Sequence, residues 1–386
     1  MSAPDRQLRG AAAIVGASLG TPGPRPGFGP LDLLAEASHG ALREAGLTLA
    51  DVDGLFVGSA YHYLSTLSAA EYLGIRPRFS DNNMVGGSSF VSHLLTAAMA
   101  LASGQCSVAL ICYGSNQGTG FGKLKSMSEV QKYEAPYAPR YPISSYALAA
   151  ARHMHQYGTT RRDLAEVAVA ARRWAQLNPE AQERGELTID DVLASRMVSD
   201  PLSLLDCCLV TDGAGALVLV RAERAGDFPR PPVYVLGAAA AHWHRQIACM
   251  PDLTVTAAAE SGPRAMAMAG ISHADIDVVE LYDAFTINTL LFLEDLGFCA
   301  KGEAGDFVRD GAIAPGGRLP VNTNGGGLSC CHPGMYGMFL LVEAVRQLRG
   351  DAGRRQVPGA RIALCHGNGG VLSSQVTAVL GTADTL

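Results

Sequence analysis

An internal repeat restricts the fold of this chain more than any other feature of its sequence. The segment Ala45–Ala60, AGLTLADVDGLFVGSA, aligns without a gap to Ala269–Ala284, AGISHADIDVVELYDA. Six of the sixteen aligned positions are identical. A duplicated α/β unit brings loops of both copies to one pseudo-twofold seam, and ligands tend to bind beyond the strand ends at such a seam.

Two further matches follow in the same order in both copies. GGSSF (Gly86–Phe90) corresponds to GGGLS (Gly325–Ser329), and each precedes a predicted helix. After the helix, ALICYG (Ala109–Gly114) corresponds to ALCHG (Ala363–Gly367). Three ordered matches favour duplication over chance similarity.

Strand and helix patterns alternate along the chain and predict an α/β fold. Buried strands are expected at Ala11–Ala17 and Ser107–Tyr113. Apolar residues at helical spacing run over Leu31–Ala45, and Gly46 ends that helix. This order predicts parallel strands joined by helical crossovers.

The chain divides into four segments. Residues 1–113 are predicted to form the first part of an N-terminal half. Residues 114–201 are richer in charge and aromatic side chains, and they are predicted to form a loop domain over the active site. Residues 202–228 return to strand character and complete the N-terminal half. A proline-rich linker precedes the C-terminal half, residues 233–386.

Composition excludes several classes of protein. With 48% hydrophobic and 17% charged residues, the 386-residue chain is not a disordered protein. A net charge of -6 without a long basic run argues against nucleic-acid binding. The longest apolar stretch, near Leu94–Ala102, is too short to span a membrane. The N-terminal MSAPDRQLRG has no signal-peptide pattern, so a cytoplasmic location is expected.

The nine cysteines predict reduced thiols and no metal site. They are scattered through the chain, and no C-x-x-C pair occurs among them. The adjacent pairs Cys207–Cys208 and Cys330–Cys331 have poor geometry for a shared metal ion. We therefore expect neither disulfides nor structural zinc.

The glycine-rich segment Gly325–Gly337, GGGLSCCHPGMYG, is the most informative motif. Its glycines allow a close approach of the backbone to a ligand, and Pro333 restricts the chain after His332. A histidine held in this way can act as a general base or as a hydrogen-bond donor to an oxyanion. A structural histidine with satisfied hydrogen bonds is the alternative.

Two further pairs of polar residues stand at predicted strand ends. Cys365 and His366 end a buried strand before a glycine-rich turn, where they can exchange protons with a ligand or remain inert in the core. Tyr282 and Asp283 end the repeated strand of the second copy, whose first-copy counterparts are Gly58 and Ser59. A phenol can carry a proton there or pack with its hydroxyl in water.

Taken together, these segments resemble the thiolase superfamily, and most closely its sterol-carrier-protein and lipid-transfer-protein branch. The likeness covers nearly the whole chain. It is carried by Arg152–Pro179, Leu187–Leu219, Glu280–Cys299 and the GGGLSCCHPG stretch. The resemblance implies two duplicated βαβαβαββ halves in a five-layered α/β core, with an inserted loop domain over the active site.

The resemblance also suggests catalytic residues. His332 matches the histidine of the thiolase GHP motif, although Cys331 replaces the usual glycine before it. Cys365 matches the late cysteine that shuttles a proton, and His366 matches a histidine of the sterol-carrier branch. Tyr282 stands where the thiolase NEAF motif has asparagine. Substrate contacts are expected at Met84, Gly86, Ser88, Asp283, Gly326, Gly367 and Gly369.

The position of the thiolase nucleophile is the main departure from the family. The Asn-rich stretch reads NNMVGGSSF, so Met84 stands where the family has its nucleophilic cysteine. A thioether cannot form the acyl-thioester that thiolysis requires. The remaining groups suit retro-aldol cleavage of a β-hydroxyacyl-CoA, including steroid side-chain thioesters.

Two other functions stay open at the level of sequence. One is a thiolase whose nucleophile has moved to Cys330 or Cys331, and the other is a non-catalytic subunit that binds acyl-CoA. No bound cofactor is expected, because coenzyme A enters as part of the substrate. The family also implies a homodimer and a small partner with an OB-fold and a zinc ribbon, together forming a heterotetramer.

Overall fold

The computed structural model describes residues 8–121 and 132–386. Most of the N-terminal segment assessed for a signal therefore lies outside the described residues, as do residues 122–131 of the predicted loop domain. The strands are β1 Ala12–Leu19, β2 Gly54–Val57, β3 Phe79–Asp81, β4 Val108–Ser115, β5 Met197–Ser199, β6 Leu202–Ser203, β7 Gly213–Arg221, β8 Val233–His242, β9 Val278–Leu281, β10 Ile362–Gly369 and β11 Ser374–Gly381. The helices are α2 Pro30–Ala45, α3 Ser65–Leu73, α4 Ser89–Ala102, α5 Gln117–Phe121, α6 Ile143–Tyr157, α7 Arg161–Ala175, α8 Ile189–Ala194, α9 Ala258–Ala269, α10 Thr286–Asp295, α11 Ala304–Val308 and α12 Gly337–Arg349.

The repeated sequence folds in the same way in both halves. Helices α2 and α9 each end at a left-handed glycine, Gly46 with φ 70° and Gly270 with φ 68°. A short 3-10 helix follows in each copy, over Leu49–Asp51 and His273–Asp275, and then strands β2 and β9. The duplication predicted from the sequence is thus present in the backbone.

The identical aspartates of the repeat have a structural role. Asp53 accepts hydrogen bonds from the backbone N–H groups that begin β4, at 2.7 and 2.9 Å. Asp277 accepts equivalent bonds at the start of β10, at 2.8 and 2.9 Å. Each carboxylate links the repeated strand to its neighbour, so these identical residues stabilise the fold and take no part in the proposed chemistry.

The strands form one nine-stranded sheet with mirrored order, β3-β2-β4-β7-β1-β8-β11-β10-β9. Reading outward from the β1–β8 junction gives β7, β4 and β2 on one side and β11, β10 and β9 on the other. The predicted parallel pairing occurs between β2 and β4 and between β9 and β10, whereas the central pairs are antiparallel. The third strand of the second half is reduced to a single bridge between Val279 and Val321.

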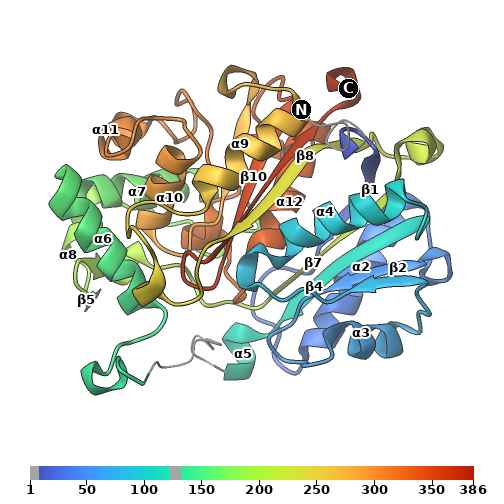
Figure 1. Cartoon of the computed structure of the whole chain (residues 1–386), viewed down its shortest axis with the longest axis horizontal. Helices are drawn as coiled ribbons and strands as arrows, with labels where there is room; N and C mark the ends of the chain where they lie inside the picture. The colour runs from blue at the N-terminus through green and yellow to red at the C-terminus, as the bar shows by residue number, and fades with distance from the viewer. Residues whose placement is uncertain (1–7, 122–131) are drawn as a thin grey trace.

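Helices and the two halves of the sheet alternate in five layers: α2, the first half of the sheet, α4 with α12, the second half of the sheet, and α9. Helices α4 and α12 contact strands of both halves, while α2 packs on β1, β4 and β7, and α9 packs on β8 and β11. Alternation along β2 shows the two faces, because Phe56 joins the central core whereas Leu55 and Val57 join the core beneath α2. Figure 1 shows α4 and α12 between the blue and the red strands.

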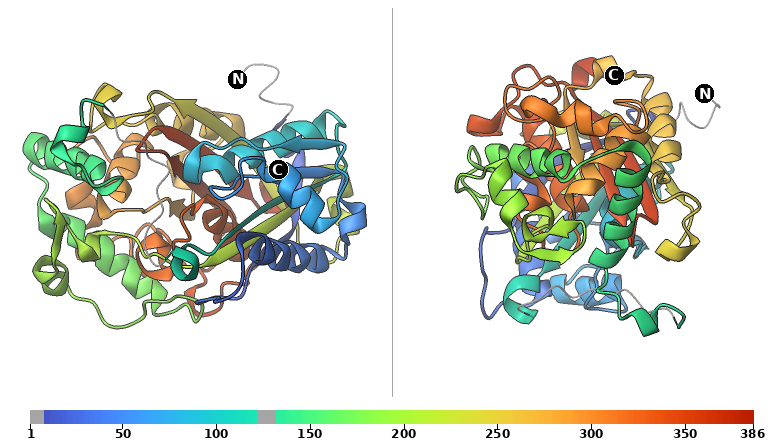
Figure 2. Two further views of the ribbon diagram at one scale, coloured as in Figure 1. Left: turned by 90° about the horizontal axis from the view of Figure 1, so that it is seen from below. Right: turned by 90° about the vertical axis from the view of Figure 1, so that its left-hand side faces the viewer.

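The segment between β4 and β7 holds α5 to α8 and the two-stranded β5–β6 sheet. Helices α6 to α8 lie at one end of the molecule beside α10 and α11 (Figures 1 and 2). The segment boundaries given above remain predictions. Over residues 8–121 and 132–386, no helix is long and apolar enough to cross a membrane.

Candidate active site

A cavity of about 550 Å³ lies where the two halves meet the start of α6. Its wall includes Tyr61, Met84, Gly86, Gly87 and Tyr113 from the first half, Pro142 and Tyr146 at the start of α6, and Tyr282, Phe285, His332 and Asn368 from the second half. A mainly aromatic and apolar wall with a few polar groups is typical of a site that orients an apolar ligand at one reactive end.

Tyr282 and His332 form a hydrogen-bonded pair in this wall. The Tyr282 Oη lies 3.0 Å from His332 Nε2, and the two rings meet edge to face. The backbone N–H of Tyr336 donates a further hydrogen bond to the same Oη, at 3.2 Å. The phenol oxygen therefore sits between an imidazole nitrogen and a fixed N–H donor, which suits a group that changes its charge during a reaction.

Burial keeps both members of the pair neutral at pH 7. It raises the pKa of Tyr282 well above its usual value, with Cys208, Tyr146 and Tyr113 adding to the effect. Burial also lowers the pKa of His332 to about 4. His332 Nδ1 has no hydrogen-bond partner among the described residues. At neutral pH the site thus holds a neutral phenol beside a neutral imidazole.

Local packing fixes these two side chains. Tyr282 follows the last residue of β9, and its N–H donates to the carbonyl of His366 at 3.0 Å. A Cβ on Gly87 would lie 2.1 Å from the Tyr282 ring, so only glycine admits the ring. The His332 N–H donates to Thr211 Oγ1 at 3.0 Å. The close packing at Gly87 and the hydrogen bond to Thr211 thus hold the two residues in place.

Asp283 supports the glycine-rich turn and does not line the cavity. Its Oδ1 accepts a 2.6 Å hydrogen bond from the Gly327 N–H, and burial raises its pKa to about 7. A Cβ on Gly326 would lie 2.0 Å from Asp283 Oδ2. The structure thus places Asp283 and Gly326 together, behind the turn that carries His332.

The remaining predicted glycines and Ser88 form the seam between the halves. A Cβ on Gly86 would meet Gly370 N at 2.6 Å, and one on Gly369 would meet the Val85 carbonyl oxygen at 1.7 Å. Ser88 Oγ lies 2.7 Å from Ser374 Oγ across the same contact. Gly86 and Gly369 line the cavity, whereas Ser88 and Gly367 lie behind it.

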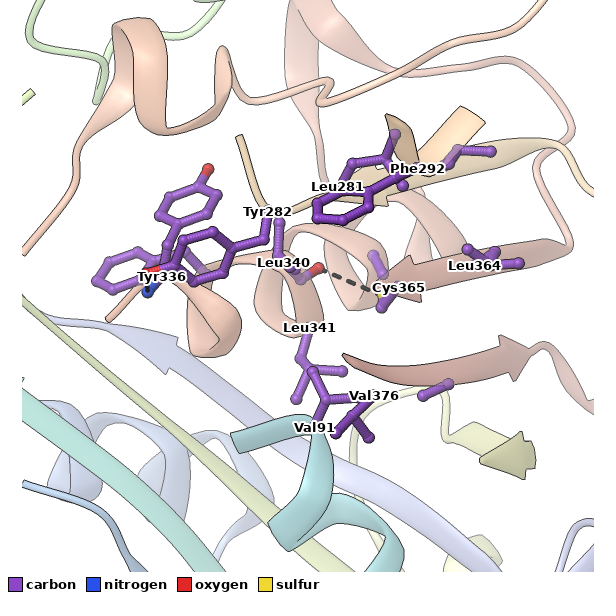
Figure 3. Close-up of a cluster of buried hydrophobic side chains, with 14 of the residues drawn as sticks. Val91, Leu281, Tyr282, Phe292, Tyr336, Leu340, Leu341, Leu364, Cys365 and Val376 are labelled. Atoms are coloured by element: carbon purple, nitrogen blue, oxygen red, sulfur yellow. Dashed lines mark hydrogen bonds between the residues drawn. The ribbon is translucent and has the colours of Figure 1, made fainter. Parts of the chain in front are cut away.

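The predicted thiols do not line the cavity. Figure 3 shows Cys365 among apolar side chains, with its thiol directed to the Leu340 carbonyl at 3.7 Å. Burial raises the pKa of Cys365 well above its usual value. A hydrogen bond with Cys330, and burial, do the same for Cys331. A thiol kept protonated in this way is a poor nucleophile.

His366 is also set back from the cavity. Its Nδ1 lies 2.9 Å from Thr377 Oγ1 and its Nε2 lies 2.8 Å from Gln375 Oε1. Burial lowers its pKa to about 4. These contacts satisfy both ring nitrogens, so His366 is connected to the cavity through other side chains.

Met84 lines the cavity and is 39% exposed. Its side chain presents a thioether, and no thiol, to the cavity. Several cavity residues were missed by sequence reasoning, among them Tyr61, Tyr113, Tyr146 and Asn368. Asn368 belongs to the ALCHGNGG segment and could have been predicted together with Cys365 and His366, whereas no local sequence pattern marks the three tyrosines.

Comparisons with known proteins agree with this architecture. Residues 239–382 match the family model described as thiolase C-terminal domain-like. The chain is 38% identical to the acetyl-CoA acetyltransferase of Methanothermobacter thermautotrophicus, over 88% of this chain and 91% of that protein. It is 36% identical to the steroid side-chain-cleaving aldolase of Thermomonospora curvata, over 89% of this chain and 92% of that protein. The solved structure of the Ltp2-ChsH2(DUF35) aldolase superposes with a TM-score of 0.88 at 35% identity, over 97% of this chain and 98% of that chain.

Proposed function

This chain belongs to the thiolase superfamily, and on that premise we propose that it cleaves a β-hydroxyacyl-CoA thioester by a retro-aldol reaction. The Tyr282–His332 pair carries the proposal, because it lies in the cavity wall while Met84 occupies the position of the family's nucleophile. A steroid side-chain thioester is the proposed substrate class. Two observations support this class: one of the similar proteins is named a steroid side-chain-cleaving aldolase, and the cavity wall is largely aromatic and apolar.

In the proposed step, Tyr282 Oη accepts the proton of the β-hydroxyl while its own proton passes to His332 Nε2. The electron pair of the O–H bond forms the carbonyl of one product, and the Cα–Cβ bond breaks. The electrons of that bond form the enolate of the shorter acyl-CoA, and the proton held by His332 then returns through Tyr282 to Cα. The imidazolium and the enolate form together, so their attraction offsets the low basicity of a buried histidine.

The Tyr336 N–H assists this transfer. It donates to Tyr282 Oη at 3.2 Å and so favours the negative charge that develops on the phenol oxygen. No covalent bond between protein and acyl group is needed at any stage. Met84 is compatible with this route and incompatible with an acyl-thioester at its position.

Two parallel incubations of the purified protein test the proposal. A β-hydroxyacyl-CoA should yield a shorter acyl-CoA and a carbonyl compound in equal amounts. A β-ketoacyl-CoA with free CoA should remain intact. Thiolysis of the second substrate would instead support the alternative thiolase with its nucleophile at Cys330 or Cys331. Binding without turnover of either substrate would support a non-catalytic acyl-CoA-binding subunit.

The proposal extends to assembly and location. We propose a homodimer, because β3 forms an edge of the sheet in the described part of the chain and can pair with a second copy. A small OB-fold and zinc-ribbon partner would complete a heterotetramer. In support, the name of the similar Ltp2-ChsH2(DUF35) aldolase includes a second component. Light scattering of the chain, alone and co-expressed with such a partner, tests both. The proposed location stays cytoplasmic.

A further inference from the structure

A chain of hydrogen bonds runs from the buried His366 to the cavity wall. Gln375 Oε1 lies 2.8 Å from His366 Nε2, and Gln375 Nε2 donates to Asn368 Oδ1 at 2.8 Å. Asn368 Nδ2 then donates to Tyr146 Oη at 2.9 Å. Tyr146 and Asn368 line the cavity, and His366, Gln375 and Asn368 are at most 2% exposed.

One backbone carbonyl sets the direction of this chain. Tyr146 Oη donates to the Gly370 oxygen at 3.2 Å, and a carbonyl oxygen can only accept. The Oη must therefore accept from Asn368, which places the Asn368 amide nitrogen toward Tyr146 and its oxygen toward Gln375. The Gln375 oxygen then faces His366, whose Nε2 must carry the proton.

The far end of the chain agrees with this direction. With its proton on Nε2, His366 accepts at Nδ1 from Thr377 Oγ1, at 2.9 Å. Thr377 Oγ1 also lies 2.9 Å from Ser261 Oγ. Because the Thr377 hydroxyl donates to His366, the Ser261 hydroxyl can donate to Thr377. Hydrogen bonds aligned in one direction polarise one another, so each donor is stronger than it would be alone.

We propose that Asn368 and Tyr146 form the donor pair that holds the thioester oxygen of the substrate, and that Gln375 and His366 are positioning residues that orient Asn368. Asn368 Nδ2 uses one N–H on Tyr146, and its second N–H has no acceptor among the described residues. That N–H can point to a ligand oxygen, and the Tyr146 hydroxyl can turn to the same oxygen from the Gly370 carbonyl while it still accepts from Asn368. The enolate formed in the retro-aldol step carries its charge on this oxygen.

This assignment rests on the proposed function for its substrate, and it gives the site two functional pairs, which are called its two poles. The Tyr282–His332 pair handles the β-hydroxyl proton, and the Asn368–Tyr146 pair holds the thioester oxygen. Tyr282, His332, Asn368 and Tyr146 all line the same cavity. The acyl-CoA would therefore lie between them, with Cα near both poles.

Gln375→Glu is the decisive variant, because it preserves the shape of the side chain and replaces the amide that donates to Asn368 with a carboxylate that can only accept. A carboxylate cannot donate to Asn368 Oδ1, so the Asn368 amide must rotate and turn its oxygen toward the cavity. The value of kcat on a β-hydroxyacyl-CoA should fall about 10²-fold, the loss typical of one oxyanion donor, with KM changed far less. Asn368→Ala should give a similar loss. The double variant should be no worse than Asn368→Ala alone, because Gln375 acts through Asn368.

Ser261→Ala is the matched control within the same chain. It removes the last hydroxyl and leaves Thr377 able to donate to His366, so activity should stay within twofold. Equal loss in Ser261→Ala and Gln375→Glu would show that general disturbance of the core is responsible. Multiplicative losses in the double variant, or full kcat in Gln375→Glu, would also overturn the positioning role.

Infrared spectroscopy separates this inference from the proposed function, because it needs no turnover. Bound [1-¹³C]butyryl-CoA, which has no β-hydroxyl to cleave, should show its thioester carbonyl stretch at lower frequency than in water. Asn368→Ala and Gln375→Glu should lose this shift, while Tyr282→Phe and Ser261→Ala retain it. An unshifted carbonyl in the wild-type protein overturns the donor pair. A shifted carbonyl in a protein that cleaves no β-hydroxyacyl-CoA overturns only the retro-aldol function.

Discussion

The two halves of the molecule share one backbone plan but contribute differently to the cavity. Strand β2 is followed by Gly58 and Ser59, whereas β9 is followed by Tyr282 and Asp283. The first half provides Met84 and the close-packed Gly87, and the second half provides Tyr282, His332 and Asn368. Duplication thus supplied two equivalent frames, and the proposed chemistry is concentrated on one of them.

The strongest test of this division compares two phenols in the same wall. Tyr282→Phe should lower kcat on a β-hydroxyacyl-CoA by about 10²-fold or more, because it removes the group that relays the proton to His332. Tyr61→Phe removes a first-half hydroxyl that bonds Ser115 and Gln117, and we expect less than about threefold change. Steady-state kinetics with KM and kcat determined separately would decide. Equal losses would show that both halves carry the chemistry.

A second test disturbs the contact between the halves. Gly87→Ala adds a methyl group 2.1 Å from the Tyr282 ring, which must shift away from His332. Activity should fall about tenfold, and thermal unfolding should occur at lower temperature, because overpacking typically destabilises by about 1–3 kcal/mol. Gly185→Ala, in open space, is the control and should change neither quantity. An active and stable Gly87→Ala protein would contradict the tight fit of Tyr282.

A third test compares buried histidines of the two halves through pH. Burial lowers the pKa of His93, His332 and His366 to about 4, whereas an unfolded chain binds these protons near pH 6.5. Between pH 6.5 and 4 the unfolded state holds more protons, so the free energy of unfolding falls as the pH falls. Denaturant unfolding at several pH values should reveal this slope.

His93→Leu should reduce that slope without affecting catalysis. Both ring nitrogens of His93 lack partners in the described part of the chain, and Phe56 and Phe90 pack nearby. Replacing His93 should decrease the number of protons taken up on unfolding by about one near pH 5, and kcat should stay unchanged. A kcat that falls with the slope would place a first-half histidine in the reaction.

The smallest expected effect concerns the thiols. Cys331→Ser should keep activity within about twofold, since the Cys331 thiol lies outside the cavity wall and its pKa is raised. Intact-mass measurement of the wild-type protein after exposure to acyl-CoA should show no adduct. Loss of activity in Cys331→Ser, together with an adduct on that residue, would establish thiolase chemistry in place of the aldol reaction.

The duplicated α/β frame could be predicted from the sequence, because glycines at helix ends, capping aspartates and apolar spacing act over a few residues. The structure confirmed the repeat at Gly46 and Gly270 and the predicted strands near β1, β4 and β7. It also placed the sequence-predicted Tyr282, His332 and Met84 in one cavity wall. Their roles in catalysis stay predictions.

Which polar groups reach the cavity depends on long-range packing and could not be predicted from the sequence. Cys365, His366 and Asn368 lie within four positions on one strand, and the first two are set back in the core while Asn368 lines the cavity. Sequence spacing cannot show this, because the outcome depends on what packs against each face of β10. The Tyr282–His332 contact joins residues 50 positions apart, and the Asn368–Tyr146 contact joins residues 222 positions apart. Such contacts exist only once the sheet, the seam and α6 have come together, since no local pattern encodes the distance between their ends.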